Sequence, residues 1–235
     1  MTELEKLWDK RNKKAMGKPI YDLWLDTYLP LLKEYKQEEI LDLGCGGGCD
    51  SLYLTERGYK ILACDISREA LNNVKKYIPN VKTKQMNLIE DFPFENESYA
   101  VIIADLSLHY FTDKETIHIM KEIKRILKQN GILLARVHST KNLNNETSLL
   151  EEVDKNLYRR GEELRRYFDK EDVERYFPII GKINYQEKSL KRQDTEKEKI
   201  VFEIKCQRSV DYANKLFRST SNHRKKINLF SRANT

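Results

Sequence analysis

The stretch Ile40-Leu41-Asp42-Leu43-Gly44-Cys45-Gly46-Gly47-Gly48 runs from an apolar segment into a turn rich in glycine. A strand that enters such a turn and continues into a helix brings backbone N–H groups close to a ligand. Asp65 lies 21 residues after Gly44, at the end of a second apolar segment. A carboxylate at that place can accept hydrogen bonds from both hydroxyls of a ribose. The stretch therefore predicts a site for a ligand that contains a ribose.

Strand-like and helix-like segments alternate from residue 38 to about residue 140, which predicts an α/β fold. We expect a Rossmann-like, doubly wound and mainly parallel sheet of seven strands with helices on both faces, because the strands are short and continuously apolar. The expected strands are Glu39–Leu43, Lys60–Asp65, Val81–Met86, Tyr99–Asp105, Ile132–His138, Lys182–Leu190 and Lys199–Gln207. The expected helices are 3–16, 20–35, 49–57, 68–77, 114–128 and a short one after Asp169, which is expected to cap it.

Three regions flank or interrupt this core. Residues 1–36 are expected to form a helical cap, and residues 37–207 the ligand-binding domain. Within that domain, residues 139–178 are a candidate insert or substrate lobe, and 139–168 are polar and arginine-rich without a clear strand pattern. Residues 208–235 are expected to be a loosely held basic tail, since 205–235 carry eight Lys and Arg against one acidic residue.

The glycine turn by itself also fits a nicotinamide or flavin dinucleotide. Two features favour a different ligand. The third small residue of the dinucleotide pattern is replaced by Cys49, and Asp42 would place a negative charge near a pyrophosphate. S-adenosylmethionine (SAM) instead carries a positive sulfonium, a positive ammonium and one carboxylate, which suits a helix N-terminus.

The segment Leu41–Gly48 resembles the first motif of the class I SAM-dependent methyltransferases. The resemblance extends to Asp65, to Asn87-Leu88 and to the stretch from Asp105 to Phe111, and it covers roughly residues 20–207. The chain is similar to the small-molecule branch called methyltransferase domain 11 or 25, and distantly to tellurite-resistance-type enzymes. The resemblance implies SAM as cofactor and S-adenosylhomocysteine (SAH) as product.

The resemblance also implies a role for individual positions. The turn of Asp42, Gly44, Cys45, Gly46, Gly47 and Gly48 is expected to hold the methionine part of SAM, and Asp65 the ribose. Ile66 is expected against the adenine, with Asn87 and Leu88 at its border. Many relatives have an Asp where this chain has Asn87, so we expect weaker binding there. Asp105, Leu106 and Leu108 are expected to form the floor beneath the sulfonium.

Methyl transfer from a sulfonium is an in-line displacement, which needs a general base only where the acceptor must lose a proton. His109 and Tyr110 follow the fourth strand and are the candidates, although His109 can equally be a packing residue. Tyr21, Trp24, Arg159 and Arg160 are candidate substrate residues. Trp8 and Tyr28 are further aromatic candidates, and Arg165 and Arg166 further basic ones.

The acceptor is expected to be a small molecule. The motif typical of nucleic-acid amino-methyltransferases, Asp/Asn-Pro-Pro-aromatic, is replaced by Asp105-Leu106-Ser107-Leu108. Two alternatives stay open. One is an RNA or protein methyltransferase whose basic tail contacts the substrate, and the other is a SAM- or SAH-binding subunit without catalysis.

Composition indicates the class of protein and its expected cellular compartment. Hydrophobic residues make up 40% and charged residues 34% of the chain, with a net charge of +6, as in an ordinary globular protein. An apolar leader and a membrane-spanning stretch are both lacking, so we expect a cytoplasmic protein without stable membrane insertion. Four cysteines without metal-ligand spacing predict reduced thiols and no metal site. The oligomeric state is not predicted.

Overall fold

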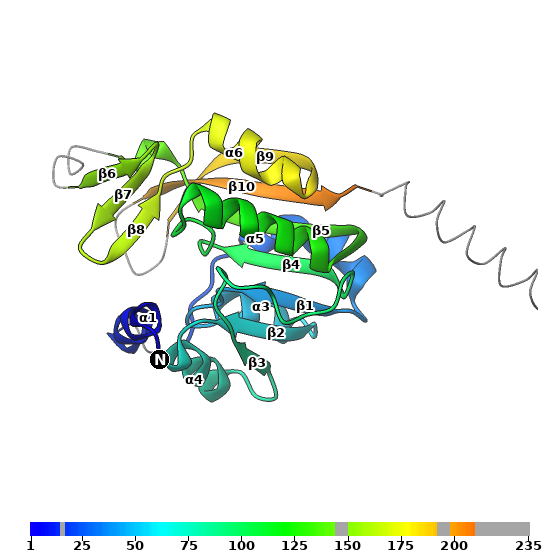
Figure 1. Ribbon diagram of the computed structural model, residues 1–235. Helices are drawn as coiled ribbons and strands as arrows, with labels where there is room; N and C mark the ends of the chain where they lie inside the picture. The colour runs from blue at the N-terminus through cyan, green and yellow to red at the C-terminus, as the bar shows by residue number, and fades with distance from the viewer. Residues whose placement is uncertain (15–16, 144–149, 192–197, 210–235) are drawn as a thin grey trace, which may run out of the picture.

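The computed structural model describes residues 1–14, 17–143, 150–191 and 198–209. In this part of the chain a seven-stranded sheet has the order β3-β2-β1-β4-β5-β10-β9 (Figure 1). Strands β1 to β5 are parallel, whereas β10 runs antiparallel to both of its neighbours. The strands are β1 (Glu39–Leu43), β2 (Lys60–Asp65), β3 (Lys82–Gln85), β4 (Tyr99–Asp105), β5 (Leu127–His138), β9 (Gly181–Leu190) and β10 (Lys199–Arg208). The predicted α/β fold class is thereby confirmed.

Helices cover both faces of the sheet (Figure 1). The α-helices are α1 (Glu3–Lys14), α2 (Leu29–Leu32), α3 (Cys49–Glu56), α4 (Arg68–Tyr77), α5 (Asp113–Ile126) and α6 (Lys170–Tyr176). Short 3₁₀ helices are η1 (Trp24–Tyr28), η2 (Lys33–Tyr35), η3 (Thr140–Asn142) and η5 (Phe177–Ile179). Each face of the sheet has its own core. Ile102 of β4 packs in the cluster that contains the α5 and α6 residues, and Ile103 in the cluster that contains α3 and α2.

Helix starts follow the local sequence. Ser67 caps α4 by accepting from the backbone N–H of Ala70, and Thr112 and Glu115 form a capping box at α5. Asp169 caps α6 in the same way, as predicted. These caps satisfy backbone donors that the first helical turn leaves unpaired. They also fix where the loops after β2 and β4 enter their helices.

The structure corrects three expected segments. The helix predicted to reach residue 128 ends at Ile126, because Leu127 is already paired with Tyr99 in the sheet. The helix expected over 20–35 is divided into η1, α2 and η2, in a segment that contains Pro30. The tail expected from residue 208 is a separate case: Arg208 is the last residue of β10, and residues 210–235 lie outside the described residues.

The third correction concerns residues 139–168, where no strand was expected. The antiparallel strands β6 (Glu151–Asp154), β7 (Leu157–Arg160) and β8 (Glu163–Arg166) form a second sheet there. The strands have four residues each and are rich in charged side chains, so they lack the apolar pattern that identifies a buried strand. Backbone N–H groups of Arg166 and Phe168 donate to the carbonyl oxygens of His109 and His138. These bonds hold the small sheet at the carboxyl end of the main sheet.

Candidate functional site

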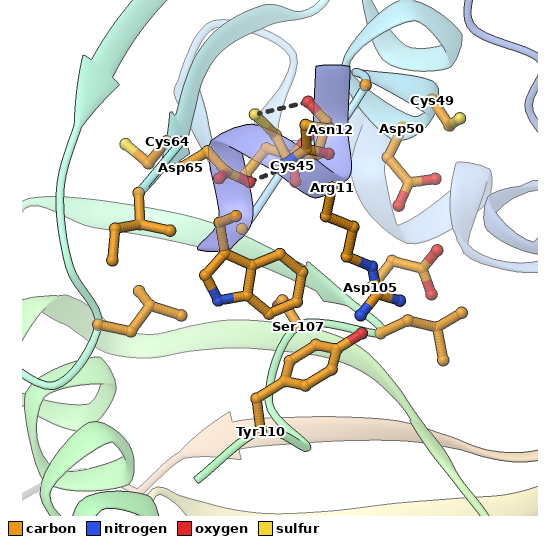
Figure 2. Close-up of a pocket in the computed structure, with 18 of the residues that line it drawn as sticks. Arg11, Asn12, Cys45, Cys49, Asp50, Cys64, Asp65, Asp105, Ser107 and Tyr110 are labelled. Atoms are coloured by element: carbon orange, nitrogen blue, oxygen red, sulfur yellow. Dashed lines mark hydrogen bonds between the residues drawn. The ribbon is translucent and has the colours of Figure 1, made fainter. Parts of the chain in front are cut away.

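A cavity of about 1020 Å³ lies at the carboxyl ends of the parallel strands (Figure 2). Eleven of the thirteen predicted cofactor residues line it: Asp42, Gly44, Cys45, Gly46, Gly47, Asp65, Ile66, Asn87, Leu88, Asp105 and Leu106. These residues follow β1, β2, β3 and β4, which end side by side in the sheet. Ligands of open α/β sheets bind at this edge.

The glycine turn after β1 is anchored to β2. The N–H groups of Gly44 and Cys45 donate to the carbonyl oxygen of Cys64 at 2.8 and 2.9 Å. The N–H of Gly46 donates to Asp65 Oδ2 at 2.8 Å. A Cβ built on Gly46 would have no atom of the described chain within 4 Å beyond its immediate neighbours. The backbone at Gly46 is therefore open toward the cavity, and a ligand can approach it closely.

Two predicted cofactor residues do not line the cavity. Gly48 adopts a φ of 93°, and a Cβ there would come within 2.8 Å of Val74 Cγ2, so it is a packing position against α4. Leu108 is 1% exposed and belongs to the core under α5. Both residues shape the loops that carry the site without lining the cavity.

Four carboxylates meet at the inner end of the cavity: Asp42, Asp50, Asp65 and Asp105. Asp42 accepts from Ser51 Oγ at 2.6 Å, and burial, with the neighbouring Asp105 and Asp65, raises its pKa to about 7. Burial likewise raises the pKa of Asp50 well above its usual range and that of Asp65 above its ordinary value. Such a cluster disfavours an anion and favours a positively charged ligand group.

Arg136, which was not predicted from the sequence, balances part of this negative charge. Its Nε and Nη2 donate to the two oxygens of Asp105 at 2.6 and 2.8 Å, and its Nη1 donates to Asp22 at 2.9 Å. Arg136 stands opposite Asp105 in the pairing of β5 with β4. A lone arginine in the apolar run from Ile132 to His138 was the signal that could have revealed it.

Trp24 does not contact the cavity, contrary to its prediction as a substrate residue. Its indole is buried, donates from Nε1 to Asp50 Oδ1 at 2.9 Å and lies 4.6 Å from the guanidinium carbon of Arg136. It therefore supports cavity residues from behind. Tyr28 is likewise absent from the lining, and its hydroxyl donates to Glu203 Oε1 at 3.0 Å. Tyr21 lines the cavity as predicted.

Of the two candidate bases, only Tyr110 lines the cavity. His109 is 0% exposed, and neither ring nitrogen has a hydrogen-bond partner among the described residues. Its ring lies against Tyr110 and His138, with centroids 4.2 and 4.6 Å away. Burial lowers the pKa of His109 well below its ordinary value, and the adjacent imidazole of His138 adds to this. His109 therefore lies behind the cavity wall and does not line it, whereas His138 does.

The arginine of the insert that lines the cavity is also different from those predicted. Arg159 is exposed on β7, forms an ion pair with Glu151 at 3.5 Å and does not line the cavity. The side chain of Arg160 lies outside the described part of the structure. Arg165 of β8 lines the cavity instead. Alternation along a strand decides which arginines point inward, and it could not be assigned while the strands themselves were not recognised.

Helix α1 supplies a wall that the sequence did not predict beyond Trp8. Leu4, Leu7, Trp8, Arg11 and Asn12 line the cavity. Arg11 Nη1 forms an ion pair with Glu163 of β8, and Asp9 accepts from Ser67 Oγ at 2.7 Å at the start of α4. The helix therefore spans the opening between the small sheet and α4, and Figure 2 shows Arg11 and Tyr110 together at the cavity.

Metal-binding clusters and membrane-spanning helices are both absent from the residues that the structure describes. In that part of the chain, no group of three or more His, Cys, Asp or Glu side chains is arranged to hold a metal ion. The helices found there are all too short or too polar to cross a lipid bilayer.

The family model described as "Methyltransferase domain" matches residues 40–131. A putative methyltransferase, YqeM of Bacillus subtilis, is 33% identical over 121 residues, which are 50% of this chain and 47% of the relative. An uncharacterized methyltransferase from Synechocystis is 32% identical over 106 residues, which are 45% of this chain and 50% of the relative. The chain thus spans about half the length of the curated relatives it matches.

Solved structures share the fold. A SAM-dependent methyltransferase from Methanosarcina mazei superposes with a TM-score of 0.67 at 21% identity, over 77% of this chain and 98% of the other. The 1,6-didemethyltoxoflavin-N1-methyltransferase of Burkholderia thailandensis, solved with bound SAH, gives a TM-score of 0.54 at 16% identity, over 80% and 82% of the two chains. In the family match over residues 40–131 and in its fold, this chain is thus similar to the class I SAM-dependent methyltransferases.

Proposed function

We propose that this protein transfers a methyl group from SAM to a small-molecule acceptor. The observation that carries the proposal is the convergence on one cavity of the open glycine turn, the Asp65 carboxylate and the buried acids. SAM presents two positive groups and a ribose, and this cavity offers a complement to each. A dinucleotide would instead bring its pyrophosphate to a turn that lies beside Asp42.

The residues present fit SAM in detail. The open backbone of Gly46 accommodates the methionine part, and Asp65 keeps lone pairs for ribose hydroxyls beside its bonds from the N–H groups of Gly46 and Ser67. Ile66 and Leu88 provide apolar contacts for the adenine, and the Asn87 carbonyl can accept from its amine. SAM, when bound, supplies an electrophilic methyl group. The protein then contributes orientation and exclusion of water, through α1 and β8 over the cavity.

A small acceptor is supported by the size of the cavity. Its volume of about 1020 Å³ lies at the upper end of the range of small-molecule sites, which suits a cofactor together with a small acceptor. The ion pair of Arg11 with Glu163 ties α1 to β8 across the opening. The RNA or protein alternative depended on the basic tail, most of which lies outside the described residues. Location in the cytoplasm stays a prediction from the sequence.

Calorimetric titration with SAH, and with NADH in parallel, tests the cofactor assignment directly. We expect SAH to bind in the micromolar range and NADH to show no saturable binding. A preference for NADH, or no binding of SAH, would contradict the proposal. Turnover of labelled SAM on an acceptor panel then separates an enzyme from a binding subunit, because the subunit would bind SAH without product.

The Asp65→Ala variant tests the ribose contact. Loss of hydrogen bonds to a charged acceptor is expected to weaken SAH binding by about tenfold or more. Asp65→Asn keeps one acceptor oxygen and should show a smaller loss in the same calorimetric experiment. Thermal unfolding followed by circular dichroism checks that both variants retain the fold. Unchanged SAH affinity in a folded Asp65→Ala variant would refute the ribose assignment.

A further inference from the structure

The cavity is also lined by charged side chains that do not come from the parallel strands. Cationic ones come from α1, β8 and the β9–β10 end: Arg11, Arg165, Lys191 and Lys199. Glu115, Glu162 and Glu163 are carboxylates among the same lining residues. Strand β5 contributes two residues to the cavity. Arg136 pairs with the acid Asp105, and His138 lies two residues further along on the same face of the strand. The acids beside the proposed SAM site are therefore carried by the parallel strands and α3, and the cationic side chains by other elements of the cavity wall.

Arg11 and Arg165 face a single carboxylate. Arg11 Nη1 and Arg165 Nη2 each pair with one oxygen of Glu163, so two guanidinium groups share one negative charge. The Nε of Arg165 is buried and has no hydrogen-bond partner among the described residues. A buried donor on a charged group costs free energy unless an acceptor reaches it. The two guanidinium groups can therefore donate hydrogen bonds to an additional anion.

Aromatic rings lie beside these two guanidinium groups. The guanidinium carbons of Arg11 and Arg165 each lie 5.8 Å from the centroid of the Tyr110 ring. The Trp8 ring packs edge-on against Tyr110 with centroids 4.6 Å apart. Flat apolar surfaces beside guanidinium groups suit a planar or apolar ligand body that ends in an anionic group.

The same cationic side chains also affect the pKa of the neighbouring His109. Burial lowers the pKa of His109 most, and the adjacent His138 and the cationic Arg165, Arg11 and Lys199 lower it further. The cationic side chains come from α1, β8 and the β9–β10 end, which are far apart in the chain, yet they act on one point. An anion placed there would be stabilised by all of them.

We propose that the methyl acceptor carries a carboxylate or a phosphate, which Arg11 and Arg165 bind beside the ring of Tyr110. The inference rests on the proposed function, because it assigns the second half of the SAM cavity. It names the class of acceptor: a small molecule with an apolar or aromatic body and one anionic group. Its reacting atom then points toward the acids beside the proposed SAM site.

The test uses the full chain saturated with SAH. Benzoate, phenyl phosphate and the neutral isostere benzamide are titrated in turn, with calorimetry or ligand-observed NMR as readout. At least one of the two anions is expected to bind about tenfold more tightly than benzamide, since a charge-assisted pair is lost in the amide. The tighter of the two anions identifies the carboxylate or the phosphate as the recognised group.

Variants separate recognition from a structural latch. Arg165→Gln and Arg11→Gln should each remove the preference for the anion while SAH affinity changes little. Glu163→Gln should strengthen anion binding, because both arginines lose their internal counter-charge. If Arg11–Glu163 only fastened α1, Glu163→Gln would weaken binding as Arg11→Gln does. Arg175→Gln is the matched control, since Arg175 also pairs with a carboxylate, Asp113, and lies over a tyrosine ring but does not line the cavity.

Equal binding of benzamide and both anions would overturn the inference, as would an anion preference that survives in Arg165→Gln and Arg11→Gln. Failure of SAH to bind would instead overturn the proposed function itself. The two failures are therefore distinguishable in one set of titrations.

Discussion

At the scale of single residues, the glycine turn contains three positive φ angles with three different causes. Gly44 has no room for a side chain, because a Cβ would lie 2.4 Å from Ser107 Cβ. Gly48 is confined by Val74 of α4. Gly46 has a φ of 51° and open space in front of it, so its glycine serves the ligand and not the packing.

Gly46→Val is therefore expected to abolish SAH binding, because its side chain would enter the cavity. The left-handed backbone costs about 1–2 kcal/mol of stability as well. Gly161→Val is the matched control: its φ is 62°, it has equally open surroundings, and it lies outside the cavity. Both variants should lose similar stability in urea unfolding, but only the first should lose SAH in calorimetry. Normal binding by Gly46→Val would show that the turn is not the cofactor site.

Asp42 predicts a pH dependence. Its pKa is raised from 3.8 to about 7, so in the free protein the carboxyl is largely protonated below neutrality. The ammonium of SAH favours the ionised form, and affinity should rise up to about tenfold from about pH 6 to about pH 8. Calorimetry across this range is the measurement, and Asp42→Asn should flatten the profile. A flat profile in the unaltered protein would argue against Asp42 near the ammonium.

The raised pKa of Asp42 also makes the free energy of unfolding depend on pH. Between about pH 4 and 7 the native state holds a proton on Asp42 that the unfolded state has released, so this group lowers stability as pH rises through that window. Asp42→Asn cannot ionise and still accepts from Ser51. It should unfold at a higher temperature than the unaltered protein at about pH 8.

At the scale of elements, α1 is attached at a few points. None of its residues is buried. Asp9 accepts from Ser67 and Glu69, Arg11 pairs with Glu163, and the Trp8 ring packs on Tyr110. Exposed ion pairs of this kind contribute little to stability. The helix nevertheless forms one wall of the cavity. Its contribution is therefore expected in binding more than in folding.

Deletion of residues 1–14 tests this expectation. The midpoint of thermal unfolding should fall by less than about 4 °C, which corresponds to about 1 kcal/mol for a domain of this size. SAH affinity should fall measurably, because the deletion opens the cavity to water. Lys6→Ala, which breaks only a surface ion pair of α1 with Glu3, should change neither quantity. A large drop in the midpoint would show that α1 belongs to the folding core.

At the scale of the whole molecule, stability resides in two cores separated by one sheet. Alternate residues of β4 enter opposite cores, with Ile102 on the α5 and α6 side and Ile103 on the α3 side. Both are 0% exposed. The cavity lies at the edge of this sheet, so the site is placed by strands that are buried on both faces.

Ile102→Ala and Ile103→Ala should each lower the free energy of unfolding by about 2–5 kcal/mol, since each leaves a cavity in a packed core. Urea unfolding measures the change. Val153→Ala, at a position that is 37% exposed, should cost far less. A loss below about 1 kcal/mol at one of the two isoleucines would show that this side of the sheet is loosely packed.

The sequence predicted the strands and turns best where the pattern is local. β1, β2 and β4 begin and end at the predicted residues, and the turn from Asp42 to Gly47 lines the cavity as expected. The sequence did not predict β6 to β8, because these short charged strands have no apolar face. It also misplaced the start of β5, where the pairing of Leu127 with Tyr99 ends the preceding helix early. The site residues missed are those whose role depends on a distant partner.

The sequence by itself determined the parallel sheet, the open glycine turn and the acid after β2, because apolar runs, glycine conformations and helix caps act within a few residues. Only the tertiary structure decided that Arg136 pairs with Asp105 and Asp22, that Arg11 meets Glu163 across 152 residues of chain, and that His109 is buried beside the cavity. Long-range pairing and burial depend on how whole elements pack, and no local pattern specifies which charges will share one low-dielectric cavity.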